Sequence, residues 1–264
     1  MLSYETYGKG NPAVLLHAFP LFSAMWKREA KALENFSKVI LPDLPGFGRS
    51  PRQSQPSMAA MAREVVAVLD HLKIKEPVFI GGLSMGGYVS FEFFRQFPKR
   101  VRSLGLFSTR AAADTPEAKE RRFQTIQKIK TDGLAAFAEK AVTNLLGKTT
   151  LETKPQVVSQ VKEMIVAHSP EGVTDALLAM AERRDSTDLL GSISCPALVI
   201  AAEEDASVPL LESESFAKKI PCAQFHVMKR VGHLANLEDP PAFQSLLKSF
   251  LTQSLKVSLK VPGT

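Results

Sequence analysis

The chain has 264 residues, of which 45% are hydrophobic and 23% are charged, a composition typical of soluble globular proteins. Its 33 basic and 27 acidic side chains give a net charge of +6, but no run of five like charges occurs. Because the basic residues are scattered, the sequence favours a solvated surface and argues against a nucleic-acid or membrane patch.

Cysteine content and hydropathy indicate the compartment. The two cysteines, Cys195 and Cys222, are too few for a disulfide framework, and each lies at the edge of an apolar run, where we expect a small buried side chain. The N-terminal residues lack the features of a signal peptide, and no apolar run approaches the ~20 residues that span a bilayer. We therefore expect a cytoplasmic protein.

Apolar runs and helical periodicity alternate through the first 110 residues. We expect strands at residues 2–7, 13–16, 39–41, 77–80 and 101–107, and helices at residues 26–33, 57–72 and 85–97. Apolar strands that alternate with helices predict an α/β fold with a parallel sheet and right-handed crossovers.

The rhythm changes between residues 115 and 185, where four helical segments and no strand are expected. Thr-Pro at 115–116 and Ser-Pro at 169–170 are helix-start signals, and Gly133 and Gly147 indicate helix ends. We interpret residues 115–185 as a helical lid (cap) inserted over the carboxyl edge of the sheet. A separate helical domain is the less favoured alternative, because strands resume directly afterwards.

The core would then comprise residues 1–114 and 186–264. Its second part is expected to contain strands at residues 196–202 and 223–228 and a helix at residues 211–219 between them. A last helix carries Phe243, Leu247 and Leu251 at fourfold spacing. Residues 256–264 show no clear pattern.

The segment Gly82-Leu83-Ser84-Met85-Gly86 lies between an expected strand and an expected helix. A Gly-x-Ser-x-Gly turn of this kind presents a serine nucleophile on a strained backbone, and glycine at both flanking positions relieves the crowding. The alternative is a glycine-rich turn with an incidental serine. A base, an acid and an oxyanion donor elsewhere in the chain would decide between the two.

Candidate catalytic groups lie where the expected strands end, because ligands of open parallel sheets bind at the carboxyl ends of the strands. This rule selects five residues: His17, Asp43, Ser84, Asp205 and His233. A serine hydroxyl needs a base such as histidine, and the imidazole needs a carboxylate to orient it.

Two histidines compete for the role of base. His233 follows a glycine in a loop after the last strand, whereas His17 follows an inner strand. The other three, His71, His168 and His226, lie in helix or strand patterns, and we interpret them as structural.

For the acid, Asp205 is better placed than Glu203 or Glu204 to turn toward the loop. Asp114, which follows another strand, is a less favoured alternative. The resulting chain order, Ser84, Asp205 and His233, is the order of α/β-hydrolases.

Four motifs occur in the order of one superfamily: His-Ala-Phe-Pro at 17–20, Asp-Leu-Pro-Gly-Phe-Gly-Arg-Ser at 43–50, the serine turn at 82–86 and Gly-His at 232–233. Over essentially its full length the chain resembles the serine α/β-hydrolases. It is most similar to small esterases, cofactor-free haloperoxidase-like enzymes and 3-oxoadipate enol-lactonases, the last especially through residues 232–238.

The resemblance implies a role for each matching position. Ser84 would be the nucleophile, His233 the general base and Asp205 the orienting acid. The backbone N–H groups of Phe19 and Met85 would form the oxyanion hole. His17 then becomes a structural residue that shapes the oxyanion loop.

Two departures from the family pattern affect the expected structure. Ala18 stands where family members commonly have glycine, so we expect its methyl group to narrow the site or alter the loop. The chain also begins with what looks like the family's second strand. We therefore expect an α/β-hydrolase fold with a mostly parallel sheet of about seven strands, flanked by helices.

The leading function is hydrolysis of carboxylic esters through an acyl-enzyme. Alternatives on the same triad are an enol-lactonase, a carbon–carbon bond hydrolase, and a receptor or signalling protein that does not turn over its ligand. The expected partner is a small-molecule ester or lactone, with no nucleic acid, membrane, metal or organic cofactor, and with the chain as a monomer or homodimer.

The lid would determine the substrate. An enol-lactone of this kind carries a carboxylate, so a lid arginine would face the site. The candidates are Arg121, Arg122, Arg183 and Arg184, although a solvated helix face explains these arginines more readily. An acyl pocket could use Phe123, Phe137, Met164 and Met180, which are otherwise explained as the packing of the lid itself.

Overall fold

A computed structural model describes the backbone of residues 1–258 and the side chains of residues 1–255. It contains one sheet in the order β1-β3-β2-β4-β5-β6-β7, in which β1 is antiparallel to β3 and all other neighbours are parallel. The strands are β1 (Tyr4–Tyr7), β2 (Asn11–Leu16), β3 (Ser37–Pro42), β4 (Val78–Leu83), β5 (Val101–Phe107), β6 (Ala197–Ala202) and β7 (Ala223–Met228). The expected seven-stranded, mostly parallel sheet is confirmed.

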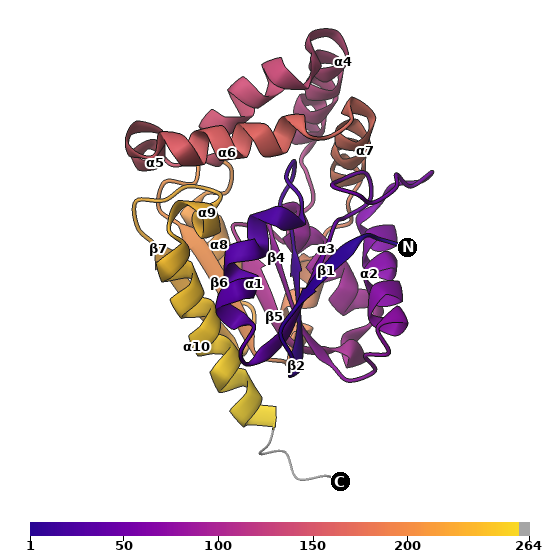
Figure 1. Ribbon diagram of the computed structural model, residues 1–264, viewed down its shortest axis with the longest axis vertical. Helices are drawn as coiled ribbons and strands as arrows, with labels where there is room; N and C mark the ends of the chain where they lie inside the picture. Colours follow the sequence, from indigo (N-terminus) through magenta and orange to yellow (C-terminus); the bar gives the residue numbers. More distant parts are fainter. Residues whose placement is uncertain (259–264) are drawn as a thin grey trace.

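Helices cover both faces of the sheet (Figure 1). One face packs against α2 (Met58–His71), α3 (Met85–Gln96) and α8 (Leu210–Ala217), and the other against α1 (Lys27–Leu33) and α10 (Pro240–Ser258). Successive residues of β2 point to opposite faces, so Val14 belongs to the first core and Leu15 to the second. Burial on both faces explains why the central strands are continuous apolar runs.

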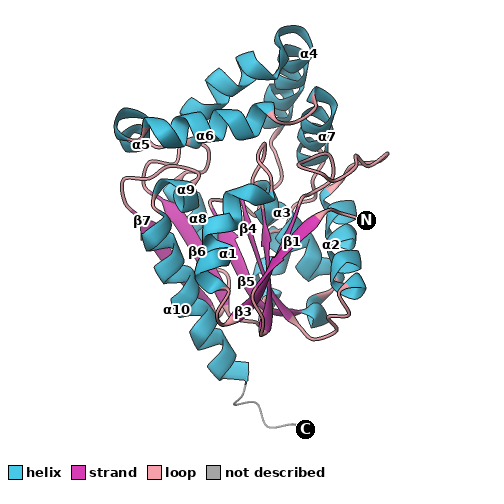
Figure 2. Ribbon diagram, viewed as in Figure 1, coloured by secondary structure: helices cyan, strands magenta, loops and turns pink. Residues whose placement is uncertain are grey.

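Between β5 and β6 the chain forms four helices, which we call the cap helices. They are α4 (Pro116–Leu145), α5 (Lys148–Thr153), α6 (Pro155–Val166) and α7 (Pro170–Ala181). They lie together at one end of the sheet (Figures 1 and 2). As the Thr-Pro and Ser-Pro signals predict, Thr115 Oγ1 accepts a hydrogen bond from Ala118 N, and Ser169 Oγ accepts one from Gly172 N.

The two glycines that are expected to end cap helices act differently from one another. Gly133, with φ +79° and ψ 174°, interrupts α4, but the helix resumes directly after it, so this residue produces a kink. Gly147 lies between α4 and α5 and is the N-cap residue of α5. Thus Gly147 marks the helix end that the sequence predicts, whereas Gly133 marks a bend.

Several local expectations need correction. β2 begins at Asn11, two residues before the expected strand, and β4 continues beyond Ile80 through two glycines to Leu83. A Cβ at Gly81 would lie 2.8 Å from the Phe79 ring, so the glycine leaves room for that ring. The short helix α9 (Ala235–Glu238) and the 3-10 helices η1 (Ser23–Trp26), η2 (Pro98–Arg100) and η3 (Thr187–Ser192) were not expected as separate elements.

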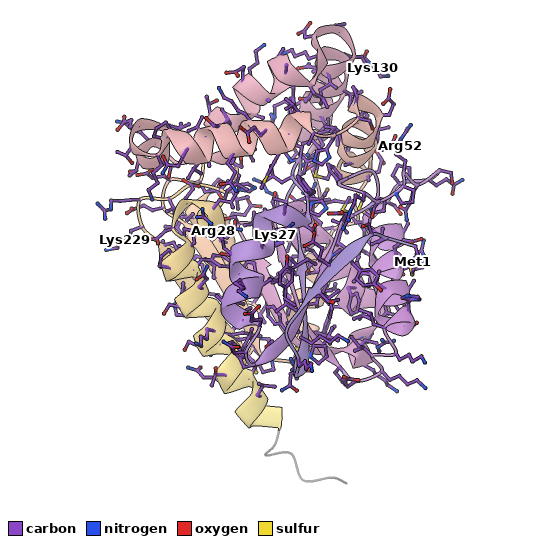
Figure 3. All side chains as sticks on the ribbon, in the orientation of Figure 1. Met1, Lys27, Arg28, Arg52, Lys130 and Lys229 are labelled. Carbon is purple, nitrogen blue, oxygen red and sulfur yellow. The ribbon has the colours of Figure 1, made fainter. Side chains whose placement is uncertain are left out.

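The termini and surface complete the description. The expectation that both cysteines are buried is wrong, because Cys195 is only half-buried and Cys222 is exposed. Of the tail without a clear pattern, residues up to Ser258 extend α10, and residues 259–264 lie outside the described part. No helix in residues 1–258 has the length and hydropathy to span a membrane. Basic side chains such as Arg52, Lys130 and Lys229 lie far apart on the surface (Figure 3).

Candidate active site

Ser84 occupies the sharp turn between β4 and α3. Its backbone has φ 55° and ψ −112°, a conformation that a residue with a Cβ adopts at a cost of roughly 1–3 kcal/mol. The turn brings its flanks so close that a Cβ at Gly82 would lie 2.1 Å from the Gly86 carbonyl, and one at Gly86 would lie 2.3 Å from the Leu16 carbonyl oxygen. Both glycines are therefore required by close contact, as the sequence predicts.

Asp205 and His233, which follow β6 and β7, meet beyond the ends of these strands. Asp205 Oδ2 lies 2.8 Å from His233 Nδ1, and both side chains are almost fully buried, with 1% and 3% exposed. The other oxygen, Oδ1, accepts hydrogen bonds from the amides of Ser207 (2.8 Å) and Val208 (2.9 Å). Burial opposes ionisation of Asp205, but His233 and these two amides outweigh it, so the pKa of Asp205 lies below its ordinary value.

The other acids considered for this role have hydrogen-bond or ion-pair partners other than His233. Glu203 accepts a hydrogen bond from Arg230 N, Glu204 accepts two from Thr149, and Asp114 is paired with Arg122 and Arg183. The structure therefore brings Asp205, among the acids considered, into contact with His233.

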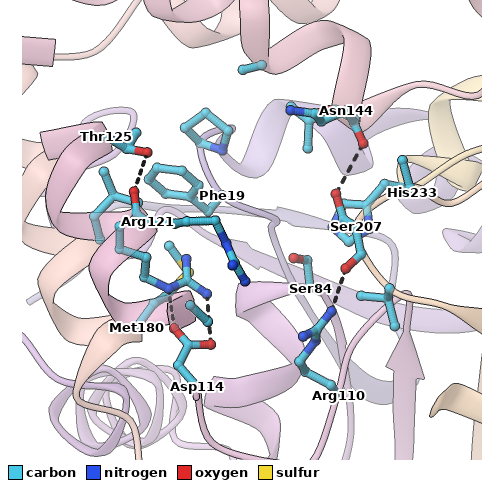
Figure 4. A pocket seen from close by; sticks show the side chains of 18 of the residues that line it. Phe19, Ser84, Arg110, Asp114, Arg121, Thr125, Asn144, Met180, Ser207 and His233 are labelled. Carbon is cyan, nitrogen blue, oxygen red and sulfur yellow. Dashed lines mark hydrogen bonds and ion pairs between the residues drawn. The ribbon is translucent and has the colours of Figure 1, made fainter. Parts of the chain in front are cut away.

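A cavity of about 440 Å³ lies between the sheet and the cap helices. Ser84 and His233 both line it, together with Phe19 from the loop after β2 (Figure 4). Its wall on the cap side comes from α4 and α7, and includes Phe137 and Met180, two of the four residues expected for an acyl pocket. A nucleophile candidate and a histidine held by a buried carboxylate thus share one cavity.

The loop after β2 is held by His17. This histidine is fully buried; its Nε2 accepts a hydrogen bond from Leu44 N (2.9 Å), so Nδ1 carries the proton and donates to Ala18 O (3.0 Å). Burial lowers the pKa of His17 to about 4, so the ring is neutral at pH 7. His17 lies outside the set of residues that line the cavity, so of the two histidines considered as base only His233 reaches it.

Ala18 does not narrow the cavity. Its side chain packs into the core beside α1 and α10, and the described residues that line the cavity include Phe19 and Pro20 but not Ala18. Its φ is negative, so the methyl group causes no backbone strain. The expectation that this methyl group crowds the site is wrong.

Met85 and Phe19 are the expected oxyanion donors. Met85 is the first residue of α3, so its N–H has no intrahelical acceptor and lies at the positive end of the helix dipole. Phe19 directly follows the loop residues that His17 holds, and its side chain lines the cavity. The assignment of these two N–H groups to an oxyanion hole stays a prediction.

Asp43 and His168 belong to the supporting structure. Asp43 is buried and accepts hydrogen bonds from the amides of Ser23 and Arg49, which fixes the loop after β3. The ring of His168 packs against Phe22 and Phe47, and burial lowers its pKa to about 4. The structural interpretation of His168 agrees with these contacts.

The four cap arginines have separate environments. Arg122 and Arg183 both pair with the buried carboxylate of Asp114, and Arg184 pairs with Asp188 on the surface. Arg121 lines the cavity and reaches across it toward Ser84 (Figure 4), and within residues 1–255 it forms no ion pair. One of the four candidate arginines therefore presents an unpaired cation to the site.

Some cavity residues carry no motif in the sequence. Arg110, three residues after β5, donates to Ser207 O (2.5 Å) and lines the cavity beside Ser84 (Figure 4). The rule that functional groups follow strand ends would have selected Arg110 as a candidate. Tyr88 and Asn144 also line the cavity, but they lie within helices, where no local signal distinguishes them. In the described part of the chain no group of three or more His, Cys, Asp or Glu side chains could hold a metal ion.

Comparison with known proteins shows the family of the chain. Residues 11–240 match the family described as "alpha/beta hydrolase fold". A thermophilic esterase from Thermogutta terrifontis, solved with malate bound, is 40% identical and superposes with a TM-score of 0.93 over 96% of this chain and 93% of that chain. The 3-oxoadipate enol-lactonase 2 of Acinetobacter baylyi is 27% identical over 95% of this chain and 92% of its own length.

A third comparison supports the fold alone. The enol-lactonase from Burkholderia xenovorans LB400 is 24% identical and has a TM-score of 0.87 over 95% of this chain and 96% of that chain. Since the family match covers most of the sequence, the chain belongs to the α/β-hydrolase family. The enzymes that it resembles along its length identify it as a hydrolase.

Proposed function

We propose that the chain hydrolyses carboxylic esters through a Ser84–His233–Asp205 triad. The observation that carries the proposal is the shared cavity: a strained serine at the start of α3 and a histidine bound to a buried carboxylate both line it. The 40% identical esterase supports an ester as the substrate. The cap helices would act as a lid, residues 115–185, over a core of residues 1–114 and 186–264.

The proposed reaction has two halves. Ser84 Oγ attacks the ester carbonyl carbon while His233 Nε2 accepts its proton, and the N–H groups of Phe19 and Met85 stabilise the oxyanion. His233 then gives the proton to the departing alcohol, which leaves an acyl group on Ser84. A water molecule, deprotonated by His233, attacks that acyl group, and the acid leaves with Ser84 regenerated.

Asp205 supports both halves by fixing His233. Because its Oδ2 is bonded to Nδ1, the ring has Nε2 free for the serine, and the imidazolium that forms is stabilised. Its low pKa keeps the carboxylate ionised at neutral pH. The amides of Ser207 and Val208 occupy the other oxygen, so the carboxylate cannot rotate away without losing them.

Replacement of the nucleophile tests the proposal. We expect Ser84→Ala to lower kcat for p-nitrophenyl butyrate by on the order of 10⁵-fold or more with an unchanged circular dichroism spectrum. Undiminished turnover would contradict the assignment. A fluorophosphonate should label the native chain on Ser84; a folded protein that does not label would favour the alternative of a receptor without turnover.

A second candidate substrate is an ester or lactone that carries a carboxylate. Arg121 favours it, since this cation lines the cavity and forms no close ion pair within residues 1–255. Guanidinium groups bind carboxylates with two parallel hydrogen bonds. The bound malate of one relative is a dicarboxylate, and another relative acts on an enol-lactone. The same triad would open the lactone ring by the same steps.

A further inference from the structure

The loop that carries His233 packs directly against one corner of the cap, residues 144–154, which we call the cap corner. Leu234 N donates a hydrogen bond to Leu145 O (3.2 Å) at the end of α4. A Cβ on Gly232 would lie 2.2 Å from the amide nitrogen of Gly147, so at this point the two backbones touch. The histidine loop therefore cannot move independently of the cap corner.

The carboxylate of Glu238 lies at the centre of this contact. Glu238 is 1% exposed; its Oε2 accepts hydrogen bonds from Gly147 N (2.9 Å) and Gly232 N (3.0 Å), and its Oε1 accepts one from Leu234 N (3.2 Å). Two of these amides flank His233 in the chain, and the third belongs to the cap. Hydrogen bonds to an ionised carboxylate are roughly twice as strong as neutral ones.

The loop that carries Asp205 is attached to the same corner. Glu204, next to Asp205, accepts hydrogen bonds from Thr149 N (2.8 Å) and Thr149 Oγ1 (2.6 Å). On the other side of the aspartate, Ser207 Oγ donates to Asn144 O (3.1 Å). Both loops of the His233–Asp205 pair are thus bonded to one short segment of the cap.

We infer that Glu238 is a positioning residue, whose carboxylate fixes the His233 loop to the cap corner and so fixes how the imidazole is presented to Ser84. This inference rests on the proposed triad. It adds that the cap is part of the catalytic support as well as a cover for the substrate. A displacement of about 1 Å in a catalytic group can cost on the order of 100-fold in rate.

Glu238→Gln tests the inference, because the amide keeps the size of the side chain but turns one acceptor into an NH₂ group that faces N–H donors. We expect kcat for p-nitrophenyl butyrate to fall about 10- to 100-fold, with KM changed by less than about 3-fold. A fall in kcat with a nearly unchanged KM separates a misplaced imidazole from a damaged substrate pocket. Circular dichroism gives the folded fraction of each preparation, so the fall in kcat is expressed per folded site.

Glu152→Gln is the matched control, since Glu152 lies on α5 of the same corner but is 61% exposed and faces only Lys148; it should behave as the native chain. If Glu238→Gln does not fold, Gly147→Ala replaces it: its Cβ would lie 2.6 Å from Gly232 N. This variant should lower kcat, with KM again changed by less than about 3-fold. A native kcat per folded site would overturn the inference. Ser84→Ala, assayed in parallel, would still be inactive in that case, whereas an active Ser84→Ala would overturn the triad itself.

Discussion

At the scale of single residues, the two carboxylate oxygens of Asp205 have different partners, so that one oxygen contacts the His233 ring while the other holds the carboxylate in place. Its Oδ2 is bonded to His233 and its Oδ1 to two backbone amides, and its side chain is almost fully buried. An asparagine would fit the same space, but its NH₂ group must then face either an amide donor or the imidazole. If it faces the imidazole, the ring is forced into the wrong tautomer.

We therefore expect Asp205→Asn to fold but to lower kcat for p-nitrophenyl butyrate by on the order of 10³- to 10⁴-fold. Asp70→Asn is the control, because Asp70 is 59% exposed and pairs with Arg100 on the surface. Steady-state kinetics on both variants check the expectation. A similar loss in both, or none in either, would argue against Asp205 as the orienting acid.

The raised pKa of Glu29 predicts that the free energy of unfolding depends on pH. Glu29 is fully buried on α1, its Oε2 has no hydrogen-bond partner within the described protein, and burial raises its pKa to about 7 from an ordinary 4.5. Between these two values the folded chain keeps a proton that the unfolded chain releases. The contribution of Glu29 to the free energy of unfolding is therefore greatest below pH 4.5 and falls as the pH rises to about 7. The total change is at most about 3 kcal/mol.

Glu29→Gln should remove this dependence, since glutamine does not titrate. Relative to the native chain, the variant should gain stability between pH 5 and pH 8 by about 2 kcal/mol. Urea unfolding of both proteins at the two pH values measures the difference, and all other titrating groups cancel in it. Parallel pH dependences of the two proteins would contradict the raised pKa.

At the scale of elements, the sheet and the contact between Asp205 and His233 could be predicted from the sequence, because the signals for both are local. Burial on both faces produces apolar runs, so the central strands are recognisable, and strand ends place Ser84, Asp205 and His233 on one edge. Gly82 and Gly86 are explained by the turn itself.

The cap could be predicted only as a set of helices. Periodicity indicates that a helix has an apolar stripe, but it does not indicate which polar residues form ion pairs. Arg121 and Arg122 therefore look alike in the sequence. Both line the cavity, but Arg122 pairs with Asp114, whereas Arg121 forms no ion pair within residues 1–255. The sequence likewise indicates no role for Glu238. The three hydrogen-bond partners of its carboxylate are Gly147, Gly232 and Leu234, and the first of these lies far from the other two in the chain.

The kink of α4 yields a prediction about the cap. Gly133 has φ +79° and ψ 174°, a region that is essentially restricted to glycine, although no atom lies within 4 Å of a Cβ built there. We expect Gly133→Ala to lower the free energy of unfolding by about 1–3 kcal/mol through backbone strain alone. Gly191→Ala is the control, because that site is equally open and its φ lies outside the left-handed region.

Urea unfolding of the two alanine variants separates the backbone strain at position 133 from the general effect of adding a methyl group. The Gly191 variant should stay within about 0.5 kcal/mol of the native chain, or gain slightly from a less flexible unfolded state. Equal stabilities of the two variants would show that the kink tolerates a side chain.

At the scale of the whole molecule, charge acts at two ranges. The net charge of +6 attracts any anion from a distance, but the basic residues are dispersed over the surface (Figure 3), so this field has no strong direction. Arg110 and Arg121, in contrast, lie in the cavity beside Ser84. An anionic substrate would thus gain mainly from these local groups, which salt screens less than it screens the surface field.

Two arginine variants distinguish direct binding in the cavity from long-range attraction by the net charge, because each variant lowers the net charge by one. For mono-p-nitrophenyl adipate, which carries a carboxylate, we expect Arg121→Met to lower kcat/KM about 10- to 50-fold through loss of a charged hydrogen bond. It should change kcat/KM for the neutral p-nitrophenyl hexanoate by less than about 2-fold. Arg184→Met, on the surface beside Asp188, should leave both within about 2-fold.

Repeating the assays at low and high salt completes the test. If Arg121 binds the carboxylate directly, the difference between the two variants should persist in 0.5 M salt, where the Debye length is only about 4 Å and the surface field is screened. If both variants lose activity on the adipate ester equally, and salt abolishes the loss, attraction would come from net charge alone. The carboxylate-bearing substrate class would then lose its support, while ester hydrolysis by Ser84 would be unaffected.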